Sequence, residues 1–333
     1  MMSRIALSPL TLVVGALLVV ACQDGPVALP ATRASVAASL FERGETRSAT
    51  ALDFTTFDVP GASTTLALDV NAGGVIVGRY AMAGKTHGFL RTKEGGFTTI
   101  DFPGAVFTTV NGINRRGDIV GTYSLASSPS VRHGYVGKNG EFTSIDPPGS
   151  NLTTANGIND RGDIVGRFCT LATCVPLPGN GDFHGFLLRE GEYTTIDFPG
   201  SGETNAFKIT DRGQIVGGYG TPDGKELPFV LTRGEFASIA LPGGMPISQD
   251  NGGINARGDI VGVFCNGAPP CFIGPRIHGY MLSGGDLTTI DVPGATATAA
   301  VGINARREIV GYSFDASGSG HGYLLRWGQR DGK

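Results

Sequence analysis

The sequence has 333 residues, a formal net charge of −3 and 41% hydrophobic residues, which is enough apolar material for a sizeable core. Its 26 basic and 29 acidic residues are well mixed, which argues against nucleic acid or another polyanion as a partner. The 53 glycines recur at fixed offsets, so they mark turns rather than low complexity.

Residues 1–21 have the organisation of a signal peptide. Arg4 supplies a positive charge near the start, and residues 5–20 form an apolar stretch too short to be a convincing membrane span. The next residue is Cys22, within the tetrapeptide VVAC. VVAC resembles the bacterial lipobox, whose cysteine is lipidated and becomes the new N-terminus. Lipidation of Cys22 would anchor the chain in a membrane, whereas the alternative is an ordinary secretory signal cut after a small residue.

Gln23 follows the cysteine, as in lipoproteins that are sorted to an outer membrane. The sequence therefore predicts an exported protein of the cell envelope, an outer-membrane lipoprotein, with a secreted protein as the alternative. Residues 22–51 are small, polar and proline-containing, without a sustained period. We interpret them as a flexible tether with a reach on the order of 30 Å, and residues 328–333 as a short tail.

Residues 52–327 consist of three short signatures that recur six times in fixed order, with a period of 43 to 51 residues. The first is aromatic-Thr-Thr-Ile-Asp-x-Pro-Gly, as in YTTIDFPG from Tyr193. The second is Gly-Ile-Asn-x-x-Gly-Asp-Ile-Val-Gly, as in GINDRGDIVG from Gly157, with decayed copies that begin at Asp69 and Lys208. The third is His-Gly-aromatic. This regularity indicates one repeat domain.

Each repeat contains four short β-rich runs separated by Gly-containing turns, which is the content of a propeller blade. The region opens with a lone fourth strand, 54–59, and ends at residue 327 with a repeat that lacks its fourth strand. Pairing of these two parts would close a ring and leave no free sheet edge. The sequence therefore predicts an all-β, six-bladed β-propeller of about 45-residue repeats, with a β-solenoid as the alternative.

One class of loop varies in length. The segment between Ile-Val-Gly and the histidine slot has 8, 11, 17, 9, 15 and 9 residues in the successive repeats. In a four-stranded meander these loops emerge on the same face as the Pro-Gly loops, which we call the variable face. Rigid scaffolds usually bind their ligands through such variable loops. The candidate binding residues on this face are Asp182, Asp223, Lys225, Glu226 and Arg276.

The two longest variable loops contain the four remaining cysteines, Cys169, Cys174, Cys265 and Cys271. In an exported protein, close pairs of cysteines predict two local disulfides, one in each loop. A zinc site made from all four is a weaker alternative. It would need loops that lie two blades apart to converge, and the two-residue spacing typical of zinc ligands is missing.

The tripeptide Arg-Gly-Asp begins at Arg116, Arg161 and Arg257, always in the same turn of the second signature. We interpret it as a product of the repeat, because Asn and Gly suit a hairpin turn. An adhesion motif, a calcium loop and a phosphate loop are weaker alternatives. Calcium would need more oxygen ligands, and a phosphate loop needs a following helix. The asparagines expected to have this structural role are Asn114, Asn159, Asn255 and Asn304.

Five histidines share the slot that begins the third signature: His87, His133, His184, His278 and His321. A ring of imidazoles around a metal is conceivable, but equivalent residues of neighbouring blades are usually too far apart. We expect each imidazole to hydrogen-bond to backbone or to a nearby hydroxyl, and the Asp before each Pro-Gly to stabilise that turn. Leu227 fills the slot in the remaining repeat. Neither a metal nor a cofactor is predicted.

The repeat as a whole, GINDRGDIVG followed by HGFL, resembles the bacterial extracellular HAF repeat. That repeat is named for a His-Ala-Phe tripeptide and also contains Ile-Asn-x-x-Gly-x-Val-Val-Gly. The resemblance covers residues 52–327, with Gly in place of the Ala and usually no Trp after the aromatic residue. It implies an exported bacterial protein and no established activity.

Two functions remain open at this point. The preferred one is a non-catalytic, lipid-anchored binding or scaffolding propeller whose variable face contacts an envelope glycan, peptide or protein. The alternative is a propeller hydrolase or lyase that acts on extracellular polysaccharide. An enzyme would need convergent acid and base groups that break the repeat, and the variable loops offer few of them.

Overall fold

The computed structural model describes residues 52–172, 174, 182–223, 225–241, 245–265 and 277–327, with backbone alone for residues 245–251. The predicted signal peptide, the tether with Cys22, and the C-terminal tail lie outside the described residues. Every regular element in these ranges is a β-strand. The described part of the chain contains no helix that could span a bilayer.

Three sheets of four strands follow the chain in order. Their strands are β10 (Leu152–Ile158), β11 (Ile164–Cys169), β12 (His184–Arg189) and β13 (Glu192–Ile196); β14 (Thr204–Ile209), β15 (Ile215–Gly220), β16 (Glu226–Thr232) and β17 (Glu235–Ser238); and β18 (Met245–Ile254), β19 (Ile260–Cys265), β20 (Ile277–Ser283) and β21 (Asp286–Ile290). Each of these repeats therefore forms a meander of antiparallel hairpins.

A fourth sheet of four strands joins the two ends of the repeat region. It contains β22 (Ala297–Ile303), β23 (Ile309–Phe314), β24 (Gly320–Trp327) and, beside β24, the N-terminal strand β1 (Leu52–Phe57). Strands β1 and β24 are antiparallel, with Leu52 opposite Trp327 and Phe57 opposite Gly322. The observed strand starts two residues earlier than the predicted strand 54–59.

The remaining sheet has eight strands. Its members are β2 (Thr64–Val70), β3 (Ile76–Met82), β4 (Lys85–Arg91), β5 (Phe97–Ile100), β6 (Ala105–Ile113), β7 (Ile119–Leu125), β8 (His133–Lys138) and β9 (Glu141–Ile145). Strands β2–β5 and β6–β9 are antiparallel meanders, and a single parallel pair, Thr86 opposite Phe107, joins β4 to β6.

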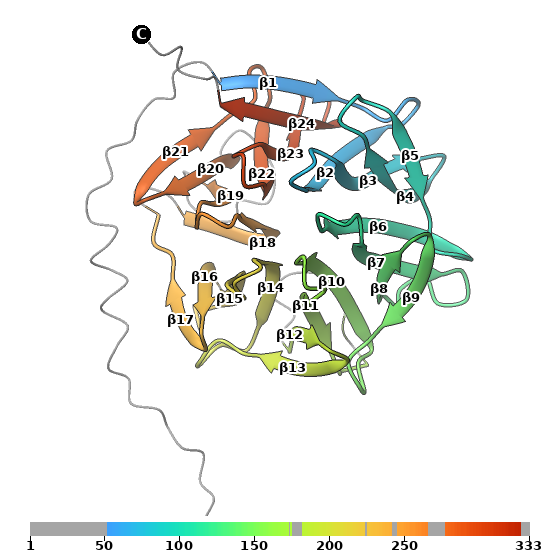
Figure 1. Ribbon diagram of the computed structural model, residues 1–333, viewed down its shortest axis with the longest axis vertical. Coiled ribbons are helices and arrows are strands. Elements are labelled where there is room, and N and C mark those ends of the chain that lie inside the picture. Colours follow the sequence, from blue (N-terminus) through green and yellow to red (C-terminus); the bar gives the residue numbers. More distant parts are fainter. Residues whose placement is uncertain are drawn as a thin grey trace, which may run out of the picture. The chain divides into compact units, whose positions relative to one another are not determined.

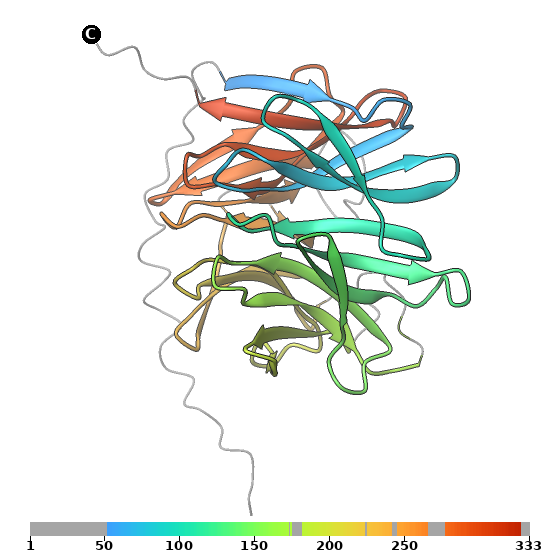
Figure 2. The ribbon, with the colours of Figure 1, turned by 45° about the vertical axis from the view of Figure 1, so that its right-hand side comes forward.

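We number the repeats by their strands: the first is β2–β5, the second β6–β9, the third β10–β13, the fourth β14–β17, the fifth β18–β21, and the sixth β22–β24 with β1. The first strand of each repeat lies nearest a common centre, and the last lies at the periphery (Figure 1). A rotated view shows the twist of the strands within each sheet (Figure 2). The prediction of an all-β, propeller-like fold is confirmed.

The glycine of Ile-Val-Gly is required because two strands and a ring approach it closely. A Cβ atom on Gly166 would lie 2.0 Å from the Thr154 carbonyl oxygen and 2.7 Å from the Phe186 ring. Phe186 is fully buried and packs between neighbouring sheets with Val120, Ile158 and other apolar residues. The sheets therefore pack against one another through apolar side chains, with glycine where neighbouring strands and rings approach most closely, and this packing brings the inner strands together at the centre.

Candidate functional site

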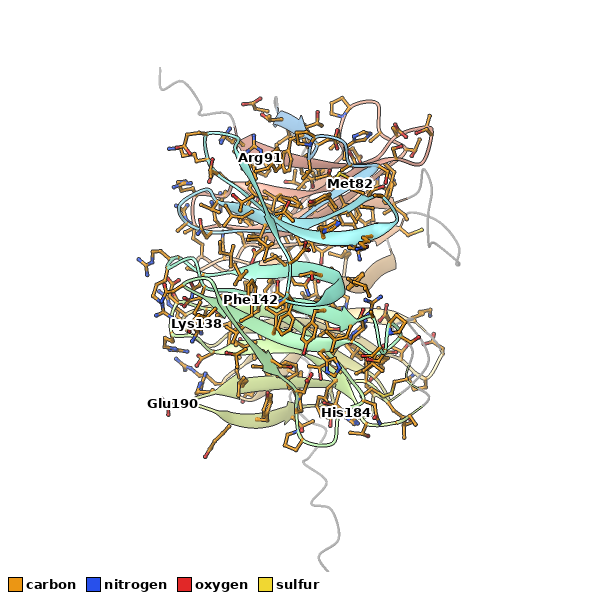
Figure 3. The ribbon with its side chains drawn as sticks, turned by 90° about the vertical axis from the view of Figure 1, so that its right-hand side faces the viewer. Met82, Arg91, Lys138, Phe142, His184 and Glu190 are labelled. Carbon is orange, nitrogen blue, oxygen red and sulfur yellow. A yellow bond between two sulfur atoms is a disulfide. The ribbon has the colours of Figure 1, made fainter. Side chains whose placement is uncertain are left out.

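The described residues surround a cavity of about 330 Å³ where the inner strands end in their first hairpin turns. We call it the axial funnel. It lies on the face opposite the variable face, because the first and second connections of a meander emerge at opposite ends. Figure 3 shows these two ends: Met82 and His184 lie on the variable side, and Lys138 and Glu190 lie at the hairpin turns.

The wall of the axial funnel is a ladder of side-chain amides. Within its own turn, Asn159 accepts backbone hydrogen bonds at Oδ1 from Arg161 at 3.0 Å and Asp163 at 2.9 Å. Its Nδ2 donates to the carbonyl oxygen of the equivalent residue in the next repeat, Thr210, at 3.2 Å. The other bonds of this inter-repeat ladder are Asn71 to Asn114 (3.1 Å), Asn114 to Asn159 (3.2 Å), Asn255 to Asn304 (3.1 Å) and Asn304 to Asn71 (3.0 Å).

The ladder contains all four predicted asparagines together with Asn71. A threonine, Thr210, takes the place of the asparagine in the fourth repeat, and no bond from its side chain to the fifth repeat is found in the described region. Each carboxamide thus shapes its own turn and ties that turn to the next repeat.

The floor of the axial funnel contains an ion pair between opposite repeats. The Nζ of Lys208 lies 3.1 Å from Oδ2 of Asp69, and it also donates to the carbonyl oxygens of Asn156, at 3.0 Å, and Asn111. Three acceptors match the three N–H groups of an ammonium. Burial lowers the pKa of Lys208, while the negative charge and hydrogen bond of Asp69 act in the opposite direction.

Asp69 and Lys208 occupy the same position of the repeat. The other repeats have glycine there, at Gly112, Gly157, Gly253 and Gly302. Space explains the glycines: a Cβ on Gly302 would lie 2.8 Å from the Cα of Asp69. The two decayed copies of the second signature, at Asp69 and Lys208, were visible in the sequence, but their contact was not predicted. Opposite charges at one slot of two repeats were the signal that could have revealed the contact.

Two of the three Arg-Gly-Asp turns are internally paired, Arg116 with Asp118 and Arg161 with Asp163, whereas Asp259 of the third turn pairs with Arg307. Nη2 of Arg161 lies 3.0 Å from Oδ2 of Asp163, and Arg189 of the same repeat also donates to this carboxylate. Burial alone would raise the pKa of Asp163, but hydrogen bonds from Arg189, Asn159 and Arg161 outweigh it and hold the pKa below its usual value. In these two turns the charges of the tripeptide therefore serve the turn itself.

The rim of the axial funnel is polar on one side and apolar on the other. Arg115 forms an ion pair with Asp160 at 2.7 Å, and the backbone nitrogen of Asp160 donates to Oδ1 of Asp211 at 2.8 Å. Arg115 and Asp211 are exposed, and Asp160 is partly buried. The exposed alanines of the remaining rim are Ala72, Ala256 and Ala305.

Each of the five histidines pairs with the aspartate of a first signature. The Nδ1-to-carboxylate pairs are His87–Asp101 (2.9 Å), His133–Asp146 (3.0 Å), His184–Asp197 (2.8 Å), His278–Asp291 (2.9 Å) and His321–Asp58 (2.9 Å). The expectation of a backbone or hydroxyl partner was wrong, because the last two strands of each sheet place the aspartate beside the imidazole. In the fourth repeat, Leu227 stands in place of the histidine and Ala240 in place of the aspartate. The loss of both residues from the same repeat was a sequence signal that they are partners.

The structure describes most of the predicted binding residues of the variable face. Asp223 and Lys225 form an ion pair at 2.5 Å, and Glu226 is the first residue of β16. Asp182 lies in another loop, where its backbone nitrogen donates to the Gly202 carbonyl oxygen at 3.1 Å. Arg276 lies outside the described residues. Among the described residues, no hydrogen bond or ion pair joins Asp182 to the Asp223–Lys225 pair, so a common site for them stays a prediction.

The first predicted disulfide, Cys169–Cys174, is confirmed, with a Cα–Cα distance of 6.3 Å. Cys265 is also disulfide-bonded, and its predicted partner Cys271 lies outside the described residues. The described ranges contain no group of three or more His, Cys, Asp or Glu side chains that could hold a metal ion.

No protein-family model and no curated protein sequence matches this chain. Solved structures match it in fold. A proposed TolB from Agrobacterium tumefaciens has a TM-score of 0.53 at 12% identity, with 83% of this chain and 99% of that chain covered. A triple mutant of AofleA from Arthrobotrys oligospora has a TM-score of 0.50 at 12% identity, covering 84% and 88%. A streptogramin B lyase has a TM-score of 0.44 at 15% identity, covering 83% and 88%. The neighbours are β-propeller proteins, and identities this low show the fold alone.

Proposed function

We propose that this chain is a non-catalytic binding protein of the bacterial cell envelope, built on a closed six-bladed β-propeller. Six blades are supported by the eight-stranded sheet, whose two meanders are joined by the single backbone pair Thr86–Phe107 and otherwise pack face to face through apolar side chains. Closure is supported by the pairing of β1 with β24 and by the bond from Asn304 to Asn71, which continues the amide ladder from the sixth repeat to the first.

The observation that favours binding over catalysis is that Lys208 already uses all of its N–H groups in hydrogen bonds. An amine at the centre of a funnel could act as a base or a nucleophile if its lone pair were available. Here the ammonium donates to Asp69, Asn111 and Asn156, so all three N–H groups are used. Asp69 in turn accepts hydrogen bonds from the backbone nitrogens of Val70 and Ile113. The pair serves as a structural floor, and the rim is left to meet a ligand.

The rim suits a polar ligand with an apolar edge. The carboxylates of Asp160 and Asp211 can accept hydrogen bonds from hydroxyls or amides, while the alanine methyls opposite can cover an apolar edge. A sugar unit of an envelope glycan or a short peptide has this chemistry. We propose such a ligand for the axial funnel, and we retain the variable face as a second contact surface.

We further propose that Cys22 is lipidated and that residues 22–51 hold the propeller clear of an outer membrane. The support is the VVAC sequence and the HAF-like repeat of the chain. Mass spectrometry of the mature protein tests this directly. An N-terminal Cys22 carrying acyl chains is the expected product, whereas an unmodified N-terminus after a small residue would indicate a secreted protein.

Calorimetric titration of the protein against envelope glycans and peptides, with product analysis of each mixture, tests the binding function. The double variant Asp160→Asn with Asp211→Asn removes the two negative charges of the rim and is expected to weaken binding at least tenfold. Asp286→Asn changes an exposed carboxylate away from the funnel and serves as the matched control. Equal binding by all forms would move the site to the variable face. Shortened polymer products would instead establish the hydrolase or lyase alternative.

A further inference from the structure

One position of the repeat lies on the rim of the axial funnel in every blade. It is the residue that follows the asparagine of the second signature, and we call it the rim position. It places one backbone N–H group per repeat around the opening. The residues at the rim position are Ala72, Arg115, Asp160, Asp211, Ala256 and Ala305.

Two repeats show what the N–H at the rim position binds. In the second repeat, the backbone nitrogen of Arg115 donates to Oδ1 of Asp160 at 2.7 Å, and its side chain donates to Oδ2 from Nε at 3.0 Å and from Nη2 at 2.7 Å. In the third repeat, the backbone nitrogen of Asp160 donates to Oδ1 of Asp211 at 2.8 Å. The N–H at this position thus binds a carboxylate from the next repeat, and a guanidinium can complete the contact.

The fifth repeat has this N–H without the carboxylate. Its rim residue is Ala256, and the next repeat supplies Ala305, whose methyl group accepts no hydrogen bond. The two turns are neighbours in the usual way, since Nδ2 of Asn255 donates to the carbonyl oxygen of Asn304 at 3.1 Å. Both alanines are exposed on the funnel, and the described residues provide no acceptor for the Ala256 N–H.

An arginine without a carboxylate partner follows this alanine. Arg257 is exposed, and within the described ranges its guanidinium forms no hydrogen bond or ion pair. The equivalent arginines of the second, third and sixth repeats each pair with the acid two residues further on: Arg116 with Asp118, Arg161 with Asp163, and Arg306 with Glu308.

Arg307 explains why Arg257 has no partner. The acid of the Arg257 turn is Asp259, and its Oδ2 lies 2.8 Å from Nε of Arg307 in the next repeat. Arg307 occupies a slot that the other repeats fill with glycine, and its φ of 62° lies in the left-handed region. A side chain is strained there. The sixth repeat therefore accepts a strained turn, and the fifth repeat keeps an uncompensated cation.

The arginine of this turn can reach the rim residue of the next repeat. Nη1 of Arg116 donates to the carbonyl oxygen of Asp160 at 2.5 Å, and Nη1 of Arg306 donates to that of Ala72 at 2.6 Å. By the same geometry, Arg257 reaches the backbone of Ala305. A carboxylate above the Ala305 methyl group would thus have a backbone N–H and a guanidinium as donors.

Among the described turns, the fifth repeat alone combines these features. Arg212 of the fourth repeat also has no acid in its turn, but the rim residue there is Asp211, whose charge repels an anion. In the first repeat a glycine stands in place of the arginine. In the sixth repeat Glu308 neutralises Arg306.

The exposed rim has the chemistry of a sugar site more than that of a peptide site. Among the described residues, the exposed large apolar side chains are Met82 and Leu171, and neither lines the funnel. A peptide side chain would therefore find little to pack against. Asp211 uses Oδ1 for the N–H of Asp160, so Oδ2 is left to accept a hydroxyl.

We propose that the rim between the fifth and sixth repeats binds the carboxylate of an acidic sugar, a hexuronic acid unit of a glycan. The carboxylate accepts hydrogen bonds from the Ala256 N–H and the Arg257 guanidinium, in the position that the Asp160 carboxylate fills beside Arg115. A sugar hydroxyl donates to Asp211. This inference rests on the proposed function and narrows its ligand to one class.

NMR titration of the ¹⁵N-labelled protein with methyl glucuronide tests the proposal, with methyl glucoside and N-acetylglycine as comparison probes. The glucuronide is expected to bind with a Kd on the order of 1 mM and to shift the amide resonance of Ala256. The glucoside lacks the carboxylate, and N-acetylglycine lacks the ring hydroxyls. Each should bind about tenfold more weakly, as expected for the loss of a charged or multiple hydrogen bond.

Three exposed positions supply the variants. Ala305→Asp provides the missing carboxylate from within the protein and should weaken glucuronide binding at least tenfold. Arg257→Gln removes the guanidinium and should weaken it about tenfold. Arg212→Gln makes the same substitution in the fourth repeat and is the matched control, for which we expect an unchanged Kd. Thermal melts verify that each variant is folded.

The proposal is overturned if the glucuronide binds no more tightly than the glucoside, or if folded Ala305→Asp binds it as the wild type does. Equal effects of Arg257→Gln and Arg212→Gln would also overturn it. Binding of N-acetylglycine as tight as that of the glucuronide would replace the acidic sugar with a peptide C-terminus. A neutral glycan whose binding is lost in the Asp160→Asn, Asp211→Asn variant would uphold the proposed function while this inference fails.

Discussion

Replacing Lys208 with methionine should destabilise the protein by about 3 kcal/mol, because removing one member of a buried ion pair leaves the other charge without its partner. The side chains of Lys208 and Asp69 are 11% and 13% exposed, so water screens them little. Methionine keeps the apolar stem and removes all three donated hydrogen bonds. We choose the low end of the usual 3 to 5 kcal/mol range because Asp69 retains two backbone donors, from Val70 and Ile113.

A double-mutant cycle measures the pair itself. Asp69→Asn removes the negative charge, and the double variant Asp69→Asn with Lys208→Met leaves no unpaired ion. The double variant should lose about 2 kcal/mol less than the sum of the two single variants. Denaturant unfolding followed through Trp327, the single tryptophan, gives each free energy of unfolding. The idea that this pair holds the inner strands together is refuted if each single variant loses less than about 1 kcal/mol and the two losses simply add in the double variant.

Two further predictions concern pH and the amide ladder. The hydrogen bond to Asp58 raises the pKa of His321, although burial alone would lower it. Asp315, at the other ring nitrogen, raises the pKa of His321 further. The stabilisation by His321 is therefore complete below its unfolded pKa of about 6.5 and is lost as pH increases through the higher folded pKa. Thermal melts between pH 5 and 9 should show a steeper loss of Tm in the wild type than in His321→Leu. Thr210→Asn supplies the missing carboxamide opposite the Asn255 carbonyl and should raise the free energy of unfolding by about 1 kcal/mol.

Each of these predictions has a clear contrary outcome. Parallel Tm profiles for the wild type and His321→Leu would show that the imidazole does not couple protonation to folding. For the amide ladder, Asn304→Ala is the opposite change, since it removes the bond from the sixth repeat to the first. It should destabilise by about 1 to 2 kcal/mol, and a neutral Asn304→Ala together with a neutral Thr210→Asn would mean that the ladder contributes nothing.

The repeat made the propeller-like fold predictable from the sequence alone. Gly, Asn and Pro-Gly recur where turns must form, and β-branched residues recur between them, so local preference and repeat spacing agree. The structural role assigned to Asn159 followed from turn chemistry. Its bond to Thr210 did not, because it depends on how closely neighbouring repeats approach at the centre.

The parts of the site that escaped prediction all depend on contacts between strands or repeats. The carboxylate of Asp197 reaches His184 because β13 lies beside β12, which the order of signatures alone does not reveal. The pair of Lys208 and Asp69 joins the fourth repeat to the first. The variation in loop length pointed to the variable face. The axial funnel lies on the opposite face, where turns of constant length converge.

The pairing of β1 with β24 also determines the order in which this chain can fold. Asp58 and its partner His321 are 263 positions apart. The outermost strand of the last sheet, β1, is therefore synthesised first and is the last strand to find its partner. Until the final repeat has been synthesised, β1 has no strand to pair with. Contacts this distant in sequence slow folding and leave an unpaired strand exposed to other chains. Joining residue 327 to residue 52 through a short linker and opening the chain in another hairpin turn would make the same sheets from nearby segments, and such a permuted chain should fold faster.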